Sequence, residues 1–301
     1  MLTKRIAIAL SALLLSSVAL DATARGGFIF VTNNSAGTIG EYTTAGGTVA
    51  ASLVSGLSNP TGIAVSGGNL FVGDFHNLRV GEYTTAGGTV NASLVSGLNG
   101  PAGIAVSGTN MYVVVNQPTG SASVGAFTTA GGTIADPLVS ALYSPINLAV
   151  SGGDLFVGDG DHDAIGEYTT AGATVNASLI TGLSSPYGIV VSGGDLFVAN
   201  QAADTINEYT IAGVPVAVPL ISGLNGPEGL ALLGEDLYVA NAGNGTIGEY
   251  TTAGATINAA LVSGLSSLWG VAVVPEPATW ALLAAGSGLL LALRGRRSAK
   301  S

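Results

Sequence analysis

The chain has 301 residues, of which 9% are charged, 48% are hydrophobic and 46 are glycine. This composition excludes a disordered acidic chain, and the absence of cysteine excludes disulfides, thiolate metal sites and iron–sulfur clusters. The net charge is −10, and Arg25 and Arg79 are the only lysine or arginine residues between positions 25 and 274. A nucleic-acid backbone would be repelled, so we expect no nucleic-acid partner.

The N-terminus has the organisation of a secretory signal. Two basic residues precede an apolar run over residues 6–20, and Ala22 and Ala24 provide the small residues of a cleavage site. These features predict a signal peptide over residues 1–24 and export of the remainder. A retained N-terminal anchor is the alternative.

One unit is repeated along the middle of the chain. Its copies are 41 residues apart, except for a spacing of 44 caused by extra residues between Asn116 and Ser123. The first position of the unit recurs at Pro60, Pro101, Pro145, Pro186, Pro227 and Leu268. A period of this length is typical of a four-stranded β-propeller blade.

The copy that begins at Pro60 shows the expected strands of one blade. We expect strands over residues 62–65, 70–72, 80–83 and 90–95, separated by glycine-containing turns. Helical periodicity is confined to the two ends of the chain.

The two partial units at the ends of the repeat region predict a closed ring. Residues 28–31 match the second strand of the unit, and residues 269–273 match the missing first strand. Joining them completes one blade and removes two unpaired strand edges. The predicted fold is therefore an all-β, six-bladed β-propeller over residues 25–274, flanked by the signal peptide and a C-terminal membrane helix.

The repeat resembles the NHL and related six-bladed propeller repeats. The resemblance is carried by Pro60-Thr61-Gly62-Ile63-Ala64-Val65 and by Asn69-Leu70-Phe71-Val72-Gly73-Asp74. It implies the fold, but propellers have many unrelated functions, so it does not imply an activity.

Residues 275–301 form a three-part tail: Pro275, Glu276 and Pro277, then an apolar helix expected over residues 278–293, then Arg294, Arg296 and Arg297. This tail resembles the PEP-CTERM sorting signal of Gram-negative bacteria. The resemblance implies an inner-membrane-anchored precursor that an exosortase cuts and delivers to the cell envelope or the extracellular space, often alongside exopolysaccharide. A permanent single-span anchor is the alternative.

Several side chains recur at equivalent positions. Two aromatic positions per unit are expected to pack between blades. Glutamates at one position are expected to lie solvated near a strand end or to accept a hydrogen bond from the neighbouring blade, and a cation-binding ring is the alternative. These residues are Glu41, Glu82, Glu167, Glu208 and Glu249, with Ala126 in the sixth unit. The polar side chain after the second strand is expected to cap a turn by bonding to the backbone two residues on. A polar or metal-lined mouth of the central channel is the alternative. The residues at this position are Asn33, Asp74, Asp159, Asn200 and Asn241, with Val115 in the remaining unit.

The least repetitive polar stretch contains Asp159, Asp161 and Asp163, whose spacing could place oxygens around calcium. Thr170 stands where a helix-loop-helix calcium loop has Glu, so a solvated acidic loop is the alternative. No other cofactor is expected. His76 and His162, the only histidines, lie in loops of this kind and are expected at the surface.

The sequence favours a non-catalytic structural or binding module at the cell surface or in the matrix, because no unlike polar residues converge beyond one loop. One alternative is a metal-dependent enzyme that resembles propeller lactonases or streptogramin lyases and uses Asp74, Asp159 and Asn200. The other is a calcium-stabilised adhesion or polysaccharide-binding protein.

Overall fold

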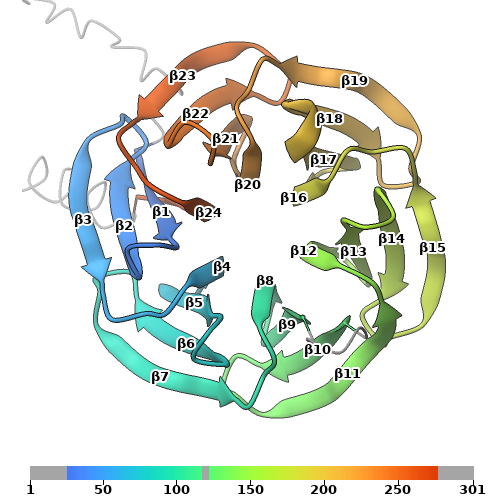
Figure 1. Ribbon diagram of the computed structural model, residues 1–301, viewed down its shortest axis with the longest axis horizontal. Coiled ribbons are helices and arrows are strands. Elements are labelled where there is room, and N and C mark those ends of the chain that lie inside the picture. Colours follow the sequence, from blue (N-terminus) through green and yellow to red (C-terminus); the bar gives the residue numbers. More distant parts are fainter. Residues whose placement is uncertain (1–25, 117–121, 277–301) are drawn as a thin grey trace, which may run out of the picture.

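The computed structural model describes residues 26–116 and 122–276, which form six four-stranded antiparallel sheets around a central channel (Figure 1). This arrangement confirms the predicted six-bladed propeller. From the channel outward, blade 1 contains β24 (Leu268–Pro275), β1 (Gly27–Asn33), β2 (Thr38–Thr43) and β3 (Thr48–Val54). Blade 2 contains β4 (Pro60–Ser66), β5 (Asn69–Asp74), β6 (Arg79–Thr84) and β7 (Thr89–Ser96), and blade 3 contains β8 (Pro101–Ser107), β9 (Asn110–Val115), β10 (Ala122–Thr128) and β11 (Thr133–Leu142).

The second half of the ring repeats this order. Blade 4 contains β12 (Pro145–Ser151), β13 (Asp154–Asp159), β14 (Ala164–Thr169) and β15 (Thr174–Ile180). Blade 5 contains β16 (Pro186–Ser192), β17 (Asp195–Asn200), the short 3-10 helix η1 (Gln201–Ala203), β18 (Thr205–Thr210) and β19 (Pro215–Ser222). Blade 6 contains β20 (Pro227–Leu233), β21 (Asp236–Asn241), β22 (Thr246–Thr251) and β23 (Thr256–Val262). The observed strands extend one or two residues beyond most of the predicted limits.

The ring closes through pairing of the two ends of the repeat region. β24 runs antiparallel to β1, with Phe28 opposite Val274 and Phe30 opposite Ala272. The partial units at the two ends therefore complete one blade, as predicted, and neither is left with an open inner edge.

The hydrophobic core lies between neighbouring blades. The twelve repeated aromatic side chains are all buried, as the sequence predicts. In one representative cluster, Phe71 and Val80 of blade 2 pack with Ile104, Met111 and Phe127 of blade 3. Each blade therefore depends on its neighbour for burial of its apolar surface, as in other repeat proteins.

At the third position of the repeat, which is glycine in five of the six blades, the inner strands approach each other closely. A Cβ atom on Gly62 of β4 would lie against the carbonyl oxygen of Ala102 and 2.9 Å from the Cα of Gly103, both on β8. The same contact recurs at Gly229, where a Cβ would be 2.6 Å from the carbonyl oxygen of Trp269. Glycine at this position allows the backbones of adjacent blades to come into contact.

Five of the six outer strands carry a residue that removes a free N–H group from the exposed edge. In β7, β15 and β23, the side chains of Asn91, Asn176 and Asn258 accept hydrogen bonds from the backbone N–H two residues on. In β11 and β19 the residue equivalent to the N–H donor is a proline, Pro137 or Pro219, which has no N–H. Both devices reduce the number of free donors on an edge, which is how β-proteins limit unwanted strand pairing. β3 has Ala50 and Ser52 at these positions and carries neither device.

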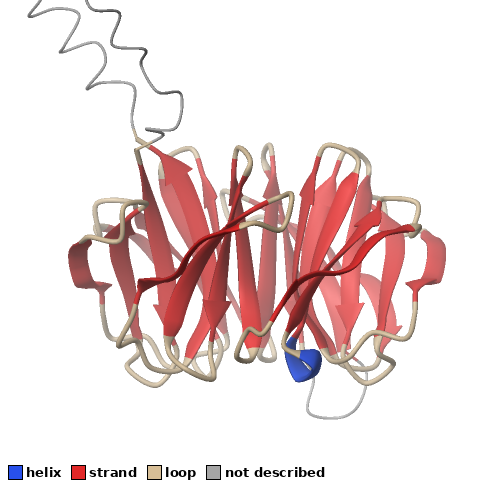
Figure 2. Cartoon of the chain, turned by 90° about the horizontal axis from the view of Figure 1, so that it is seen from above, coloured by secondary structure: helices blue, strands red, loops and turns tan. Residues whose placement is uncertain are grey.

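The two faces of the disc differ (Figure 2). The hairpin turns between first and second strands, such as residues 67–68, lie on one face, which we call the turn face. The loops between second and third strands and those that join successive blades lie on the other, which we call the loop face and which carries η1. The N–H of Glu276 donates to the carbonyl oxygen of Gly26 over 2.8 Å, so both described ends of the chain lie on the turn face.

Several predicted features lie outside the described residues. These are the signal peptide with Ala22 and Ala24, Pro277, the apolar helix over residues 278–293, and Arg294, Arg296 and Arg297. Within residues 26–116 and 122–276, no helix is long and apolar enough to cross a membrane. Pro275 and Glu276 are described and exposed.

Replacing Gly62 with alanine is expected to destabilise the fold by about 1–3 kcal/mol, because the new methyl group must displace the backbone of β8. Gly153→Ala is the matched control, since its Cβ would meet nothing within 4 Å and Gly153 has no positive φ. Urea unfolding monitored by circular dichroism measures both. Equal stability of the two variants would contradict the close approach of the inner strands.

Candidate functional site at the channel mouth

The repeated glutamates do not converge. They lie on the third strands of five different blades, and two of them accept hydrogen bonds within their own blade: Glu82 from Asn69 over 2.7 Å, and Glu249 from the hydroxyl of Tyr238 over 3.0 Å. Burial raises the pKa of Glu41 and of Glu249. Among the residues that the structure describes, no three His, Asp or Glu side chains are grouped so that they could hold a metal ion.

The polar side chains that end the second strands hold the loops between blades. Asp74, Asn200 and Asn241 each accept a hydrogen bond from a backbone N–H sixteen residues earlier, over 2.7 Å, 3.2 Å and 3.4 Å. The donors are Ser58, Ser184 and Asn225, in the loops that lead into the inner strands. The predicted bond to the backbone two residues on is therefore wrong for these three, because the loop from the preceding blade passes beside the strand end.

Two members of this set have other contacts. Asn33 donates from its amide to the hydroxyl of Thr38 over 3.3 Å, and its buried Oδ1 has no hydrogen-bond partner in the described part of the chain. Asp159 accepts from the backbone N–H of His162 over 3.3 Å. The set therefore shares a location on the loop face but not a single bonding pattern.

The Asp74 carboxylate has three hydrogen-bond partners. Besides Ser58, its carboxylate accepts from the amide of Asn77 over 2.8 Å and from Nε of Arg79 over 2.9 Å. The carboxylate is fully buried and forms an ion pair with Arg79. These contacts use its oxygens within blade 2, far from the other residues suggested for a metal-dependent enzyme.

The three aspartates suggested for calcium make separate contacts. Asp159 bonds to the ring of His162 over 2.8 Å, and this bond raises the pKa of His162. Asp163 accepts from the backbone N–H of Ser185 over 2.7 Å, while Asp161 is exposed. Asp204 makes the equivalent 2.7 Å bond to Gly226 in the next blade, so the contact of Asp163 belongs to the repeat. Calcium binding here remains a prediction that these contacts do not support.

The two histidines lie on the loop face, in different blades. Both residues are exposed, and His76 lies within 3.4 Å of the amide of Asn59. Their rings contact neighbouring aromatic rings edge-on: His76 with Phe75 and His162 with Tyr143. Neither faces the central channel.

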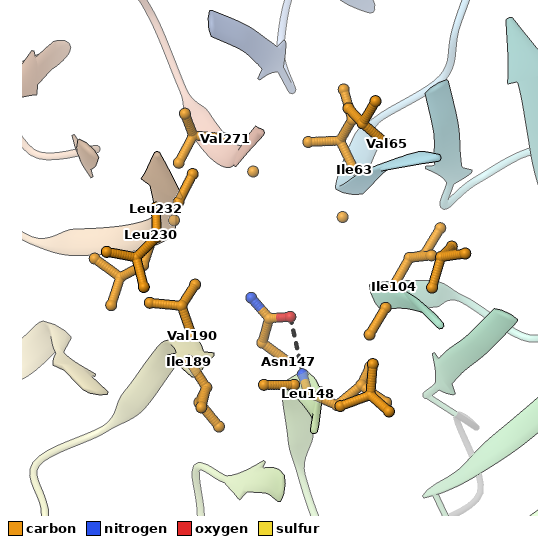
Figure 3. A pocket seen from close by; sticks show the side chains of 18 of the residues that line it. Ile63, Val65, Ile104, Asn147, Leu148, Ile189, Val190, Leu230, Leu232 and Val271 are labelled. Atoms are coloured by element: carbon orange, nitrogen blue, oxygen red, sulfur yellow. Dashed lines mark hydrogen bonds between the residues drawn. The ribbon is translucent and has the colours of Figure 1, made fainter. Parts of the chain in front are cut away.

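The side chains that line the central channel are apolar except at one position. Inner-strand valine, leucine and isoleucine side chains line a cavity of about 390 Å³ (Figure 3). Asn147 occupies the position that is glycine in the other five blades, and it is the only polar side chain among the described residues of the lining. Its Oδ1 accepts from the N–H of Leu148 over 2.9 Å, and its amide projects into the channel.

The residue just before this position differs in every blade. Around the ring it is Thr61, Ala102, Ile146, Tyr187, Glu228 and Trp269, each near the start of an inner strand. These strand starts lie at the loop face. Thr61 and Ala102 are buried there, whereas Tyr187, Glu228 and Trp269 are only partly buried. Three successive members, on β16, β20 and β24, form an asymmetric cluster, which we call the mouth cluster: Tyr187, Glu228 and Trp269.

The mouth cluster combines two aromatic rings and one perturbed acid. The ring centroids of Tyr187 and Trp269 are 5.8 Å apart, and the ring planes are inclined at 59°. Burial raises the pKa of Glu228 to about 7. The pKa of Tyr187 is also raised, mainly by burial and further by the negative charge of Glu228. All three side chains are only partly buried, so they remain accessible to a ligand.

A pocket on the loop face adjoins this cluster. It has a volume of about 390 Å³, within the usual range for small-ligand sites, and it is lined by Glu228, Trp269, Asn34 and Gln201 together with backbone of the neighbouring loops. An acid, an aromatic residue and two amide-bearing residues therefore line one space, and the amide of Asn34 donates to the carbonyl oxygen of Pro60 over 3.4 Å.

Sequence analysis did not identify the mouth cluster, although the sequence contained a signal for it. Positions on either side of it repeat closely: proline before it in five blades, and glycine after it in five. The position between them varies completely. In a chain of near-identical blades, a variable position between two repeated ones indicates that the packing of the repeat does not dictate the residue there. The expectation that unlike residues do not converge is therefore not met at the mouth.

Comparison with known proteins identifies the repeat and the fold. The sequence profile of the NHL repeat matches residues 57–83, which include all of β4 and β5 and most of β6. No curated protein matches the chain. The protein is therefore a six-bladed β-propeller that contains an NHL repeat.

Solved structures share this fold at low sequence identity. A chain of a nidogen/laminin complex aligns with a TM-score of 0.66 and 15% identity over 82% of this chain and 98% of that chain. Virginiamycin B lyase from Staphylococcus aureus aligns with a TM-score of 0.55 and 17% identity over 75% and 81%. A catalytically inactive variant of that lyase, with quinupristin, gives 0.52 and 15% over 80% and 86%. These similarities define the fold alone.

Replacing Asp74 with alanine is expected to destabilise the protein by about 3 kcal/mol, because Arg79 loses its buried partner and the N–H of Ser58 loses its acceptor. Asp161→Ala removes an exposed carboxylate and is expected to change stability by less than about 0.5 kcal/mol. Chemical unfolding of both variants tests this difference. Similar losses would show that Asp74 does not hold the loop.

Glu228 should make stability depend on pH. Its pKa is about 7 when folded and near 4.5 when unfolded, so the folded protein binds more protons between these values. The contribution of Glu228 to the free energy of unfolding is fully present below about pH 4.5 and is lost as the pH rises through about 7. Glu228→Gln should remove that loss and stabilise the protein at pH 8 by about 1–2 kcal/mol, allowing for screening of a partly exposed carboxylate, with little change at pH 4.5. Thermal unfolding at both pH values measures the difference. A variant less stable than wild type at pH 8 would contradict the raised pKa.

Proposed function

We propose that the protein is an exported, non-catalytic binding module whose partner docks on the loop face at the channel mouth. The observation that carries this proposal is the mouth cluster, where Tyr187, Glu228 and Trp269 differ from one another in a ring of otherwise repeated residues. Aromatic side chains that are half-buried at the rim of a pocket are typical of binding surfaces.

The positions of the chain ends support a binding role. Gly26 and Glu276 meet on the turn face, opposite the mouth cluster. Any attachment through the C-terminal tail therefore leaves the loop face directed away from the point of attachment. This geometry suits a module that is held at one face and engages a partner with the other.

The proposed cellular localisation is inferred from the sequences of the two termini. The signal peptide and the Pro275-Glu276-Pro277 tail, which resembles a PEP-CTERM signal, favour export, anchoring in the inner membrane and then release to the envelope or the extracellular space by an exosortase. Exopolysaccharide or another matrix component is the partner class that fits this location. The exposure of Pro275 and Glu276 supports access by a processing enzyme.

One observation favours an enzyme as the second candidate. A carboxyl group with a pKa of about 7 can donate or accept a proton near neutral pH, and Tyr187 lies within its electrostatic influence. The lyase with the same fold gives this candidate a precedent only at the level of fold. Loss of a measured turnover in Glu228→Gln would support it, whereas loss on chelation would instead support the metal-dependent lactonase-like or lyase-like alternative.

The binding proposal is tested by retention of the purified protein on matrix isolated from the producing cells. Wild-type protein is expected to sediment with the matrix, and Tyr187→Ala combined with Glu228→Gln is expected to reduce the retained fraction at least tenfold. Glu235→Gln is the matched control, because Glu235 is exposed on the turn at the opposite end of β20. Equal retention of all three proteins would overturn the proposal.

The sorting proposal is tested by the intact mass of the native protein in separate cell fractions. We expect an extracellular or envelope form that ends near residues 275–277. A form that retains Arg297 and occurs only in the membrane would show instead that the tail is a permanent anchor.

A further inference from the structure

The mouth cluster contains an acid without a basic partner. Arg79 is the only lysine or arginine between residues 26 and 276, and it is paired with Asp74 in blade 2. Glu228 lies on β20 in blade 6, so no lysine or arginine side chain of the described chain neutralises it. A partly buried carboxylate without a counter-ion is unfavourable, and a ligand cation would relieve that cost.

The aromatic rings of the cluster suit the same ligand. Tyr187 and Trp269 lie on β16 and β24, the two inner strands that flank β20, and their inclined rings form a corner beside Glu228. The face of an aromatic ring attracts a cation, and tryptophan does so most strongly. Two rings and one carboxylate at the same repeat position on three successive strands form a half-cage for an organic cation.

The remaining surroundings fit a small polar group. Asn34 and Gln201 contribute amides to the pocket that Glu228 and Trp269 line. The chain has a net charge of −10, so its overall field attracts cations toward the pocket. Beneath the mouth, Asn147 is the only polar side chain among the described residues that line the central channel.

We propose that the mouth cluster binds an ammonium group, which lies against the rings of Tyr187 and Trp269 and pairs with the carboxylate of Glu228. This inference rests on the proposed binding function and specifies the chemistry of its ligand. The ammonium group belongs either to a quaternary amine or to an amino sugar, and both present a cation with an apolar surface that can lie against an aromatic ring.

The experiment uses two charged probes, each with an uncharged counterpart of similar shape: choline with 3,3-dimethylbutanol, and glucosamine with N-acetylglucosamine. The chain has two tryptophans, so the Trp280→Phe variant contains Trp269 as its only tryptophan. Quenching of Trp269 in the full chain, checked by calorimetry, gives the dissociation constant. Tighter binding of choline identifies a quaternary amine as the preferred source, and tighter binding of glucosamine identifies an amino sugar.

We expect at least one charged probe to bind at least tenfold more tightly than its uncharged counterpart, with affinity falling as salt rises from about 20 mM to about 500 mM. Glu228→Gln should weaken this binding at least tenfold, whereas Glu235→Gln should leave it unchanged. Trp269 lies on the closing strand, so Tyr187→Leu serves as the aromatic variant and should also weaken binding.

Equal binding of charged and uncharged probes, or equal effects of Glu228→Gln and Glu235→Gln, would overturn the inference. If neither charged probe binds while the mouth variants still lose retention on matrix, the ammonium proposal fails and the binding function stands. If the mouth variants keep wild-type retention, the binding function itself fails, whatever the probes do.

Discussion

The close approach of neighbouring inner strands is the constraint on which the rest of the propeller depends. Where β4 meets β8, and where β20 meets β24, there is no room for a Cβ atom between the two backbones. Glycine therefore occupies the third position of the repeat in five of the six blades, and Asn147 stands there in blade 4. The preceding residue lies at the mouth and escapes this constraint. The variety of Tyr187, Glu228 and Trp269 is thus a consequence of where the packing leaves freedom.

A second consequence concerns the polar residues of the loop face. Asp74, Asn200 and Asn241 hold the loops that lead into the inner strands, and Asp163 and Asp204 hold the corresponding loops of the next blades. Their oxygens are engaged with backbone N–H groups. The carboxylates that resemble metal ligands in the sequence therefore stabilise the loops, whereas Glu228, whose pKa burial raises to about 7, is the only acid at its repeat position.

The fold could be predicted almost completely from the sequence, because a repeat of fixed length restricts both the strand count and the closure. The pairing of β24 with β1 followed from matching residues 28–31 and 269–273 to different strands of one unit. The mouth cluster could not be predicted in the same way, since Tyr187, Glu228 and Trp269 are about 41 residues apart and only the ring geometry makes them neighbours. The partners of Asp74 were also missed, because the bond to Ser58 depends on the path of a loop rather than on local turn chemistry.

The pairing of β24 with β1 also determines how the protein responds to force. β24 runs from the loop face to the turn face, and the chain leaves it at Pro275. A partner that pulls on Tyr187 or Glu228, which lie outside β24, against resistance at Pro275 loads β24 along its length relative to the rest of the ring. The bonds between β24 and β1, from Gly27 opposite Pro275 to Asn33 opposite Leu268, then carry the load together in shear rather than opening one after another. The strand pair that closes the ring is therefore most resistant to force directed from the channel mouth toward Pro275.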